Sequence, residues 1–176
     1  MIQYKLNTYG FVNKVEKHNS FKKYMMNYIK KQPTYRLIER LDDISNTDWK
    51  DSYNPNRPYV KKFAKLISPY LSKIGRVLKT KKFTIGNMWY QQYGKGSKHQ
   101  WHHHVSSNWS AVYYLELPNN LGTELYDITE SRTFDIKLNE GDLFLFPANM
   151  LHRSPPNMTS KIKTIISFNI DFNEVI

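Results

Sequence analysis

The sequence predicts a mainly β protein of the α+β class. We expect a double-stranded β-helix, the jelly-roll architecture that cupins also have, with N-terminal helices packed on its sheet. Helical periodicity is confined to the part before residue 80, period-2 alternation and short apolar runs follow after residue 81, and turn residues divide this second part into short segments. We therefore expect a single domain over residues 1–176, with a mostly helical cover (residues 1–80) and a double-stranded β-helix core (residues 81–176).

The N-terminal part contains two segments with the spacing of amphipathic helices. Residues 14–31 carry apolar side chains at near-helical intervals, and Pro33 ends this segment. In residues 58–78 the apolar residues recur at i, i+3, i+4 and i+7, which predicts a helix with one face packed under a sheet. Pro69 lies inside this second segment, so we expect a kink or a break there.

The remaining segments are short and fit strands or loops. We expect a short strand at residues 2–6, an edge strand or irregular stretch at residues 35–41, and a polar loop at residues 42–58. Eight further strands are separated by Gly, Pro and Asn turns. These strands are residues 83–93, 99–104, 111–117, 123–127, 133–138, 142–146, 150–154 and 161–172.

Composition narrows the possible functions. The absence of cysteine excludes disulfide and thiolate chemistry and fits a reducing compartment. No apolar run is long enough to span a membrane, and the N-terminus lacks the apolar core of a signal peptide, so we expect a cytoplasmic protein without a membrane partner. The net charge of +11 supports a nucleic-acid partner only weakly, because the lysines are scattered along the sequence.

Histidines mark the candidate site. Four of the six histidines fall between residues 99 and 104, directly before a predicted strand. His102 and His104 are two residues apart, so on a strand they point to the same side. His152 follows a second segment that begins at Gly141 and includes Pro147, just as His102 follows Gly96. Because imidazole is a common ligand of iron, zinc, copper and nickel, we expect His102, His104 and His152 to form a metal site.

The segment around these histidines resembles a family of 2-oxoglutarate- and Fe(II)-dependent oxygenases. The resemblance rests on His102-x-His104 followed by Ser107, Ser110 and residues 112–115, close to the family pattern HxHxxSxxSGVYYL, with Ala111 where glycine is usual. The run of residues 140–147, the segment 151–153, Lys163 and residues 167–169 also look like this family. The match covers roughly residues 89–169. Members occur in phages and marine bacteria and are distantly related to prolyl 4-hydroxylases.

The resemblance implies a cofactor, a co-substrate and their ligands. Fe(II) would be bound by His102, His104 and His152, the catalytic residues, and 2-oxoglutarate and O₂ would react there, yielding succinate and an oxidised substrate. Lys163 would bind the distal carboxylate of 2-oxoglutarate, with Lys161 as a second candidate of the same strand parity. Either Tyr113 or Tyr114 would donate a hydrogen bond to the co-substrate, and Asn169 is a weaker candidate for the same role.

One departure from the usual oxygenase pattern concerns the ligands. Such enzymes commonly combine two histidines with one carboxylate, whereas the middle position here is His104. Three neutral imidazoles would leave a more positive metal centre. A carboxylate from Asp127 or Glu124 on the next predicted strand is the alternative third ligand.

Two other function classes stay open. The spacing of the glycines and histidines is close to the cupin motifs, so a cupin-type metalloenzyme or a sugar-binding module without 2-oxoglutarate is one alternative. A non-catalytic basic binding module is the other, and it predicts salt-dependent binding of polyanions without a metal. The oxygenase hypothesis favours a hydroxylase, in the cytoplasm of the host cell if the source is a virus. Its primary substrate is open between a peptide or protein side chain, a metabolite and a nucleobase.

Overall fold

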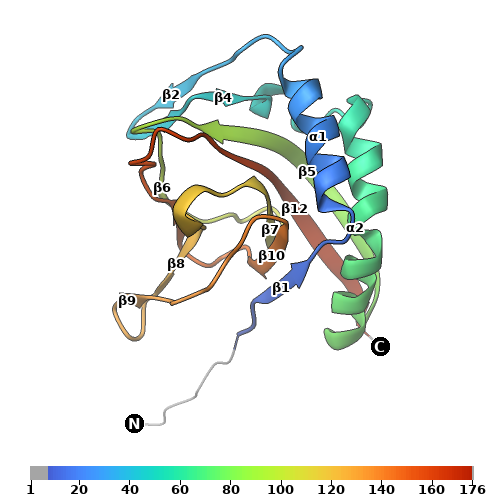
Figure 1. Ribbon diagram of the computed structural model, residues 1–176. Coiled ribbons are helices and arrows are strands. Elements are labelled where there is room, and N and C mark those ends of the chain that lie inside the picture. The colour runs from blue at the N-terminus through green and yellow to red at the C-terminus, as the bar shows by residue number, and fades with distance from the viewer. Residues whose placement is uncertain (1–7, 176) are drawn as a thin grey trace.

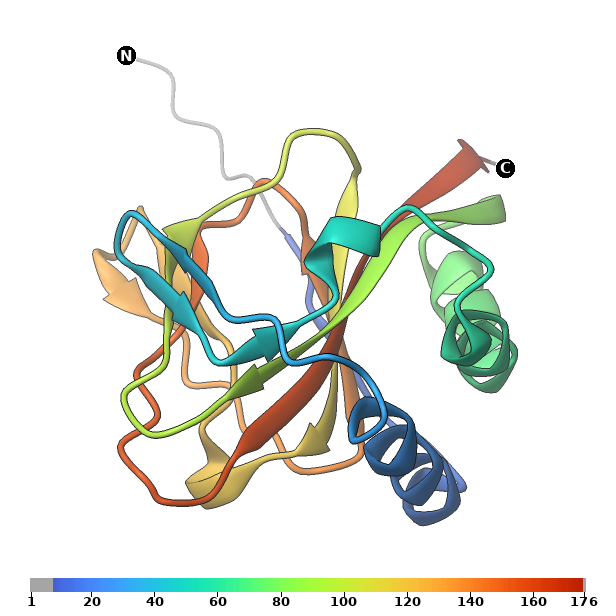
Figure 2. The same cartoon turned by 90° about the horizontal axis from the view of Figure 1, so that it is seen from above.

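Two helices cover one face of a six-stranded antiparallel sheet in the computed structural model, which describes residues 8–175 (Figures 1 and 2). The strand order in this sheet is β1-β10-β7-β12-β5-β4. Their bounds are Phe11–Lys14 (β1), Asp142–Pro147 (β10), Trp109–Glu116 (β7), Lys163–Val175 (β12), Thr80–Tyr93 (β5) and Asn46–Thr47 (β4). The central strand β7 is buried on both faces, which explains its nearly continuous apolar sequence.

A second antiparallel sheet lies on the other side of the six-stranded sheet (Figure 1). Its strands, in order, are β6 (His99–His102), β11 (His152–Ser154), β8 (Glu124–Asp127) and β9 (Arg132–Thr133). The hairpin β2–β3 (Leu37–Glu39 and Asp42–Ile44) and two 3₁₀ turns (Trp49–Asp51 and Pro118–Asn120) complete the structure. The layers are therefore helices, large sheet and small sheet, which confirms the predicted mainly β class with a double-stranded β-helix and helices packed on it.

The helices are α1 (His18–Ile29) and α2 (Pro58–Val77). Pro58 begins α2, where its missing N–H is not needed. The ring centroids of Phe21 in α1 and Phe63 in α2 are 5.3 Å apart, and both rings lie close to Tyr113 of the sheet. Aromatic packing thus joins the helical layer to the large sheet.

Strand β12 serves both faces of the large sheet. Ile166 and Ile170 belong to the core under the helices, whereas Ile165 belongs to the core between the two sheets. Lys163 and Asn169 share the parity of Ile165, and both contact residues on the side of the small sheet. This alternation brings polar residues of β12 to the face where the histidines lie.

Several predicted elements differ from the structure. Of the kink or break expected at Pro69, the break is absent, because α2 runs through this residue. Pro69 is exposed, so water can solvate the carbonyl group that loses its partner. The expected loop at residues 42–58 contains β3 and β4. Strand β1, which was not predicted, lies directly before α1. The strand expected at 133–138 is reduced to β9. The strand expected at residues 2–6 lies outside the described residues.

No helix within residues 8–175 is sufficiently long and apolar to cross a membrane.

Candidate metal centre

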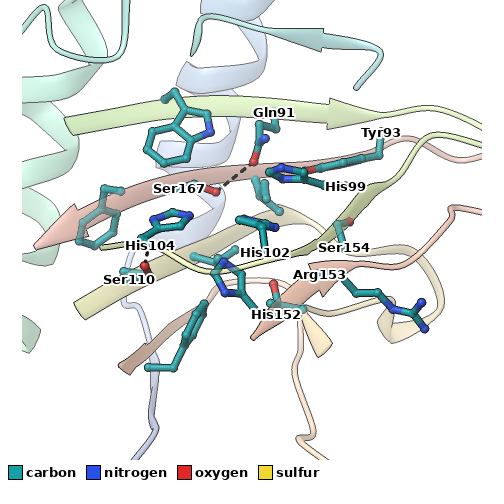
Figure 3. A pocket seen from close by; sticks show the side chains of 17 residues that line it. Gln91, Tyr93, His99, His102, His104, Ser110, His152, Arg153, Ser154 and Ser167 are labelled. Carbon is teal, nitrogen blue, oxygen red and sulfur yellow. Dashed lines mark hydrogen bonds between the residues drawn. The ribbon is translucent and has the colours of Figure 1, made fainter. Parts of the chain in front are cut away.

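The two histidine-bearing segments meet where β6 and β11 pair. His102 at the end of β6 is the direct partner of His152 at the start of β11, and His104 follows two residues after β6. One ring nitrogen of each of these three residues lies within 4.8 Å of the others. Figure 3 shows the three rings converging on one point, and we call them the histidine triad. Gly96 and Gly141, which precede the two segments, both have positive φ, as expected for turn glycines.

Hydrogen bonds fix which nitrogen atom of each ring is free. Nδ1 of His102 lies 2.7 Å from the carbonyl oxygen of Gln100, and Nδ1 of His152 lies 2.8 Å from the carbonyl oxygen of Met150. A carbonyl oxygen only accepts hydrogen bonds, so Nδ1 carries the hydrogen in both rings. Nε2 is then left with its lone pair, as a metal ligand requires.

The third ring is held by a side-chain network instead. Nδ1 of His104 lies 2.6 Å from Oδ1 of Asn169, which also accepts a hydrogen bond from the hydroxyl of Ser110. Asn169 in turn donates to Oδ1 of Asn87 at 2.9 Å. The amide of Asn169 is therefore oriented with its oxygen towards His104, and Nε2 of His104 is free in the same way.

Burial keeps the triad neutral. Desolvation lowers the pKa of His102 and of His104, and it lowers the pKa of His152 to well below its ordinary value. Neutral imidazole is the form that binds metal ions, so no proton has to be displaced near pH 7. The three imidazoles are therefore neutral and have Nε2 free, which is the form that binds a divalent cation such as Fe(II).

Replacing Asn169 with alanine is expected to weaken Fe(II) binding about 10-fold to 100-fold, because such an outer partner orients its ligand histidine. Anaerobic calorimetric titration with Fe(II) measures the effect. Asn108 is the matched control, since its side-chain amide bonds the backbone at Phe172 and not the triad. An unchanged dissociation constant for Asn169→Ala would show that His104 does not depend on this bond.

Lys163 lies in the same core region as the pocket. Its side chain is fully buried, its ammonium donates to the hydroxyl of Ser154 at 2.9 Å, and it lies 5.3 Å from the ring centroid of Tyr93. Burial lowers the pKa of Lys163 to about 7. Tyr93 and Ser154 line the pocket that contains the triad, whereas Lys163 itself does not line it, so this ammonium lies directly behind two residues of the pocket wall, with donor capacity to spare. Lys161, the second candidate, is exposed.

The two tyrosines lie on opposite faces of β7. Tyr113 faces the helices, and its hydroxyl lies 2.7 Å from Nδ1 of His18, so the structure does not bring it to the pocket. Tyr114 lies in the core between the sheets, and its hydroxyl donates to Thr123 Oγ1 at 2.9 Å. Thr123 lines the pocket, but neither tyrosine hydroxyl does.

The alternative carboxylate ligands are not brought to the triad. Glu124 binds Arg153 at 2.7 Å, and Asp127 caps the turn at Thr129. Within residues 8–175, no carboxylate joins the group of three histidines. Arg153 lies at the pocket rim, and its guanidinium points away from the histidines in Figure 3.

The pocket contains a fourth histidine, His99, which was not predicted from the sequence. The ring of His99 stacks on His102 with centroids 3.9 Å apart, and its Nε2 lies 3.6 Å from a carboxylate oxygen of Asp42. Burial lowers the pKa of His99 to about 3. Its spacing of three residues from His102 does not match strand parity, so the sequence pattern held no signal for it.

Trp89 adds an unused donor to the pocket wall. Its ring centroid is 6.5 Å from that of His104. Its indole N–H is the one buried side-chain nitrogen or oxygen without a hydrogen-bond partner among the residues described. Buried donors are usually paired, so this N–H is available to a bound molecule.

Comparisons with known proteins identify the fold. No family model and no curated protein matches the chain. Similar solved structures include the viral collagen prolyl hydroxylase vCPH from Paramecium Bursaria Chlorella virus-1 in its 2OG complex, with 16% identity over 94% of this chain and 97% of that one, at a TM-score of 0.66. A Pseudomonas putida prolyl-4-hydroxylase has 13% identity over 93% of both chains and a TM-score of 0.61.

A third similar structure is the non-heme alpha ketoglutarate dependent epimerase SnoN from nogalamycin biosynthesis. It has 10% identity over 92% of this chain and 76% of that one, at a TM-score of 0.71. At these identities the likeness concerns the fold. The chain therefore has the double-stranded β-helix fold of prolyl-4-hydroxylase-like oxygenases that depend on 2-oxoglutarate and Fe(II).

Proposed function

We propose that the protein is an Fe(II)- and 2-oxoglutarate-dependent oxygenase, a hydroxylase that couples oxidative decarboxylation of 2-oxoglutarate to oxidation of a C–H bond in its substrate. The observation that carries the proposal is the histidine triad, in which every Nδ1 is occupied by an acceptor and every Nε2 is free. The fold supports it, because the similar structures include hydroxylases of this chemistry.

In this proposal His102, His104 and His152 hold Fe(II) on one face. The metal with its co-substrate supplies the reduction of O₂, and the protein supplies position and polarity. Gln100, Met150 and Asn169 keep the three ligand rings in their tautomer and orientation. With no carboxylate in the ligand set, the site keeps the full positive charge of the metal and so favours an anionic chelator such as 2-oxoglutarate.

Lys163 binds the distal carboxylate of 2-oxoglutarate. Its partner Ser154 lies two residues after His152 on β11, so the two side chains point to the same face about 7 Å apart along the strand. A five-carbon dicarboxylate bridges such a span from the metal to the ammonium. The charge-assisted bond to a buried carboxylate is strong, because little water competes there.

Apolar side chains exclude water from the same pocket. Val112, Phe146 and Ile165 line it, and the ring of Phe146 packs against His152 with centroids 4.7 Å apart. Exclusion of water from the pocket strengthens the electrostatic contacts of the bound co-substrate and protects reactive species from solvent. The indole N–H of Trp89 is then a donor for an oxygen atom of a bound molecule.

An anaerobic titration of Fe(II)-loaded protein with 2-oxoglutarate tests the proposal. We expect the weak visible charge-transfer band of the chelate, followed by succinate formation when O₂ is admitted. Metal binding without the band would contradict the oxygenase proposal and favour a cupin-type site. Absence of metal binding would favour a non-catalytic module.

A further inference from the structure

The helical layer of the protein carries positive charge only. Helices α1 and α2 contain six lysines and one arginine but no aspartate or glutamate, although the chain has 15 acidic residues. The cations are Lys22, Lys23, Lys61, Lys62, Lys65, Lys73 and Arg76. Helix surfaces usually mix both signs, since like charges three or four residues apart destabilise a helix. Lys61 and Lys65, and Lys73 and Arg76, have this unfavourable spacing.

Part of this charge lines a groove between β1, α1 and α2. The groove has a volume of about 890 Å³, and six of its lining residues are cationic: Lys14, Lys17, Lys62, Lys65, Lys73 and Arg76. Glu16 is its only acidic residue. We call these six side chains and the groove they line the basic groove. Lysines that are scattered in the sequence are therefore gathered by the fold into one concave surface.

The cations of the basic groove are largely uncompensated. Among the described residues, only Lys14 of the six has a carboxylate partner, Asp142 at 3.6 Å. Lys62 lies over the ring of Tyr24, at 3.8 Å from its centroid, and this contact leaves its charge in place. Exposed, unpaired cations in a concave surface focus a positive field and attract polyanions.

The basic groove is separate from the candidate metal centre. It shares no lining residue with the pocket of the histidine triad, and the large sheet lies between the helical layer and the small sheet (Figures 1 and 2). Its charge therefore has no part in holding the metal or 2-oxoglutarate.

We propose that the basic groove binds the phosphate backbone of a single-stranded nucleic acid. From Lys62 to Arg76 the cations on α2 extend over about 21 Å, enough to follow several successive phosphates. Five of the six cations are lysines, whose ammonium groups bind phosphates as point charges. Tyr70 also lines the groove, and its hydroxyl accepts a hydrogen bond from the N–H of Glu16, which fixes an aromatic ring among the cations for base stacking.

The test compares two triple charge reversals of equal net charge in the full chain. The groove variant is Lys62→Glu with Lys65→Glu and Lys73→Glu, and the control is Lys95→Glu with Lys137→Glu and Lys161→Glu, three exposed lysines outside the groove. Fluorescence anisotropy with a labelled oligothymidylate measures the affinity over a series of salt concentrations. The groove variant is expected to bind at least about 100-fold more weakly at low salt, with a salt slope reduced by about 2, and the control to keep most of its affinity.

Three results would overturn the proposal. Equal losses in both variants would assign the binding to overall charge, and unchanged binding in the groove variant would exclude the groove. Tighter binding of a polyglutamate peptide of matched charge would assign the groove to an acidic protein segment. If thermal unfolding shows that the reversals destabilise the fold, Lys62→Gln with Lys65→Gln and Lys73→Gln provides the same comparison with smaller expected losses.

Discussion

His152→Ala is expected to weaken Fe(II) binding by more than about 100-fold and to abolish succinate formation, because it removes one of the three proposed metal ligands, and the loss of an outer partner alone costs about 10-fold to 100-fold. His152 is buried at the junction of β6 and β11, and its tautomer is fixed by the carbonyl of Met150. The triad is the only such group within residues 8–175, so the variant keeps two of its three ring nitrogens.

Anaerobic titration with Co(II), whose visible spectrum reports its ligands, measures this loss directly and independently of turnover. His103→Ala is the matched control: it lies between two triad residues, is exposed and belongs to no ligand group. A His152→Ala variant that folds normally and binds the metal like the unaltered protein would show that the triad is not the metal centre.

Lys163→Ala is expected to keep the metal and to raise the 2-oxoglutarate concentration needed for half-maximal binding at least about 10-fold. A charge-assisted hydrogen bond contributes about 1.5–3 kcal/mol, and this variant removes it from a buried site. Lys161→Ala is the control, since Lys161 is exposed two residues away on the chain. Equal affinities of the unaltered protein and Lys163→Ala would mean that the co-substrate is anchored elsewhere.

Binding of 2-oxoglutarate is also expected to depend on pH through Lys163. The pKa of this ammonium in the free protein is lowered to about 7 by burial, so the site is charged below pH 7 and mostly neutral above it. Affinity for the dianion should be nearly constant below pH 7 and fall by up to about 10-fold per pH unit above it, with uptake of one proton. Anaerobic titrations in buffers of different ionisation enthalpy measure that proton, and Lys163→Ala should lose the dependence.

Lys163 also makes the stability of the folded protein depend on pH. The pKa of Lys163 is about 7 in the folded protein and near its ordinary value of 10.5 when unfolded, so the unfolded chain binds more protons between these values. The contribution of Lys163 is therefore most unfavourable below pH 7 and is relieved as the pH rises towards 10.5. Lys163→Met should raise Tm most at pH 6, a difference that thermal unfolding at two pH values measures.

The sequence allowed the elements around the site to be predicted because their patterns are local. Period-2 alternation marks parts of β5 and β12, and short apolar runs mark β7 and β10. The strand spacing of His102 and His104 predicts that they lie together. Lys163 and Asn169 are an even number of residues apart on one strand, so the sequence also predicts that their side chains project from the same face. The very short strand β4 carries too few residues for any period to appear.

Other features depend on tertiary structure and have no local signal. Both faces of β7 are buried, so apolarity does not distinguish Tyr113, under the helices, from Tyr114, between the sheets. Two of the hydrogen bonds that set the tautomers of the triad are accepted by backbone carbonyl groups. Every residue type has such a group, so no pattern of side chains predicts these bonds. The basic groove was equally hidden, because lysines far apart in the chain meet only when β1, α1 and α2 pack together.

The alternation of side chains along β12 restricts where residues can be inserted into or deleted from this chain. Lys163 and Asn169 project from the same face of one continuous strand, where Lys163 bonds Ser154 and Asn169 bonds His104, two residues that line the pocket. Inserting or deleting one residue between them would turn one of the two side chains to the helix-covered face, because side chains alternate. A substitution at one of these positions changes one side chain only, whereas a change of length would remove either the proposed co-substrate anchor or the hydrogen bond that supports His104. Length variation should therefore be confined to loops, such as the turn before β12.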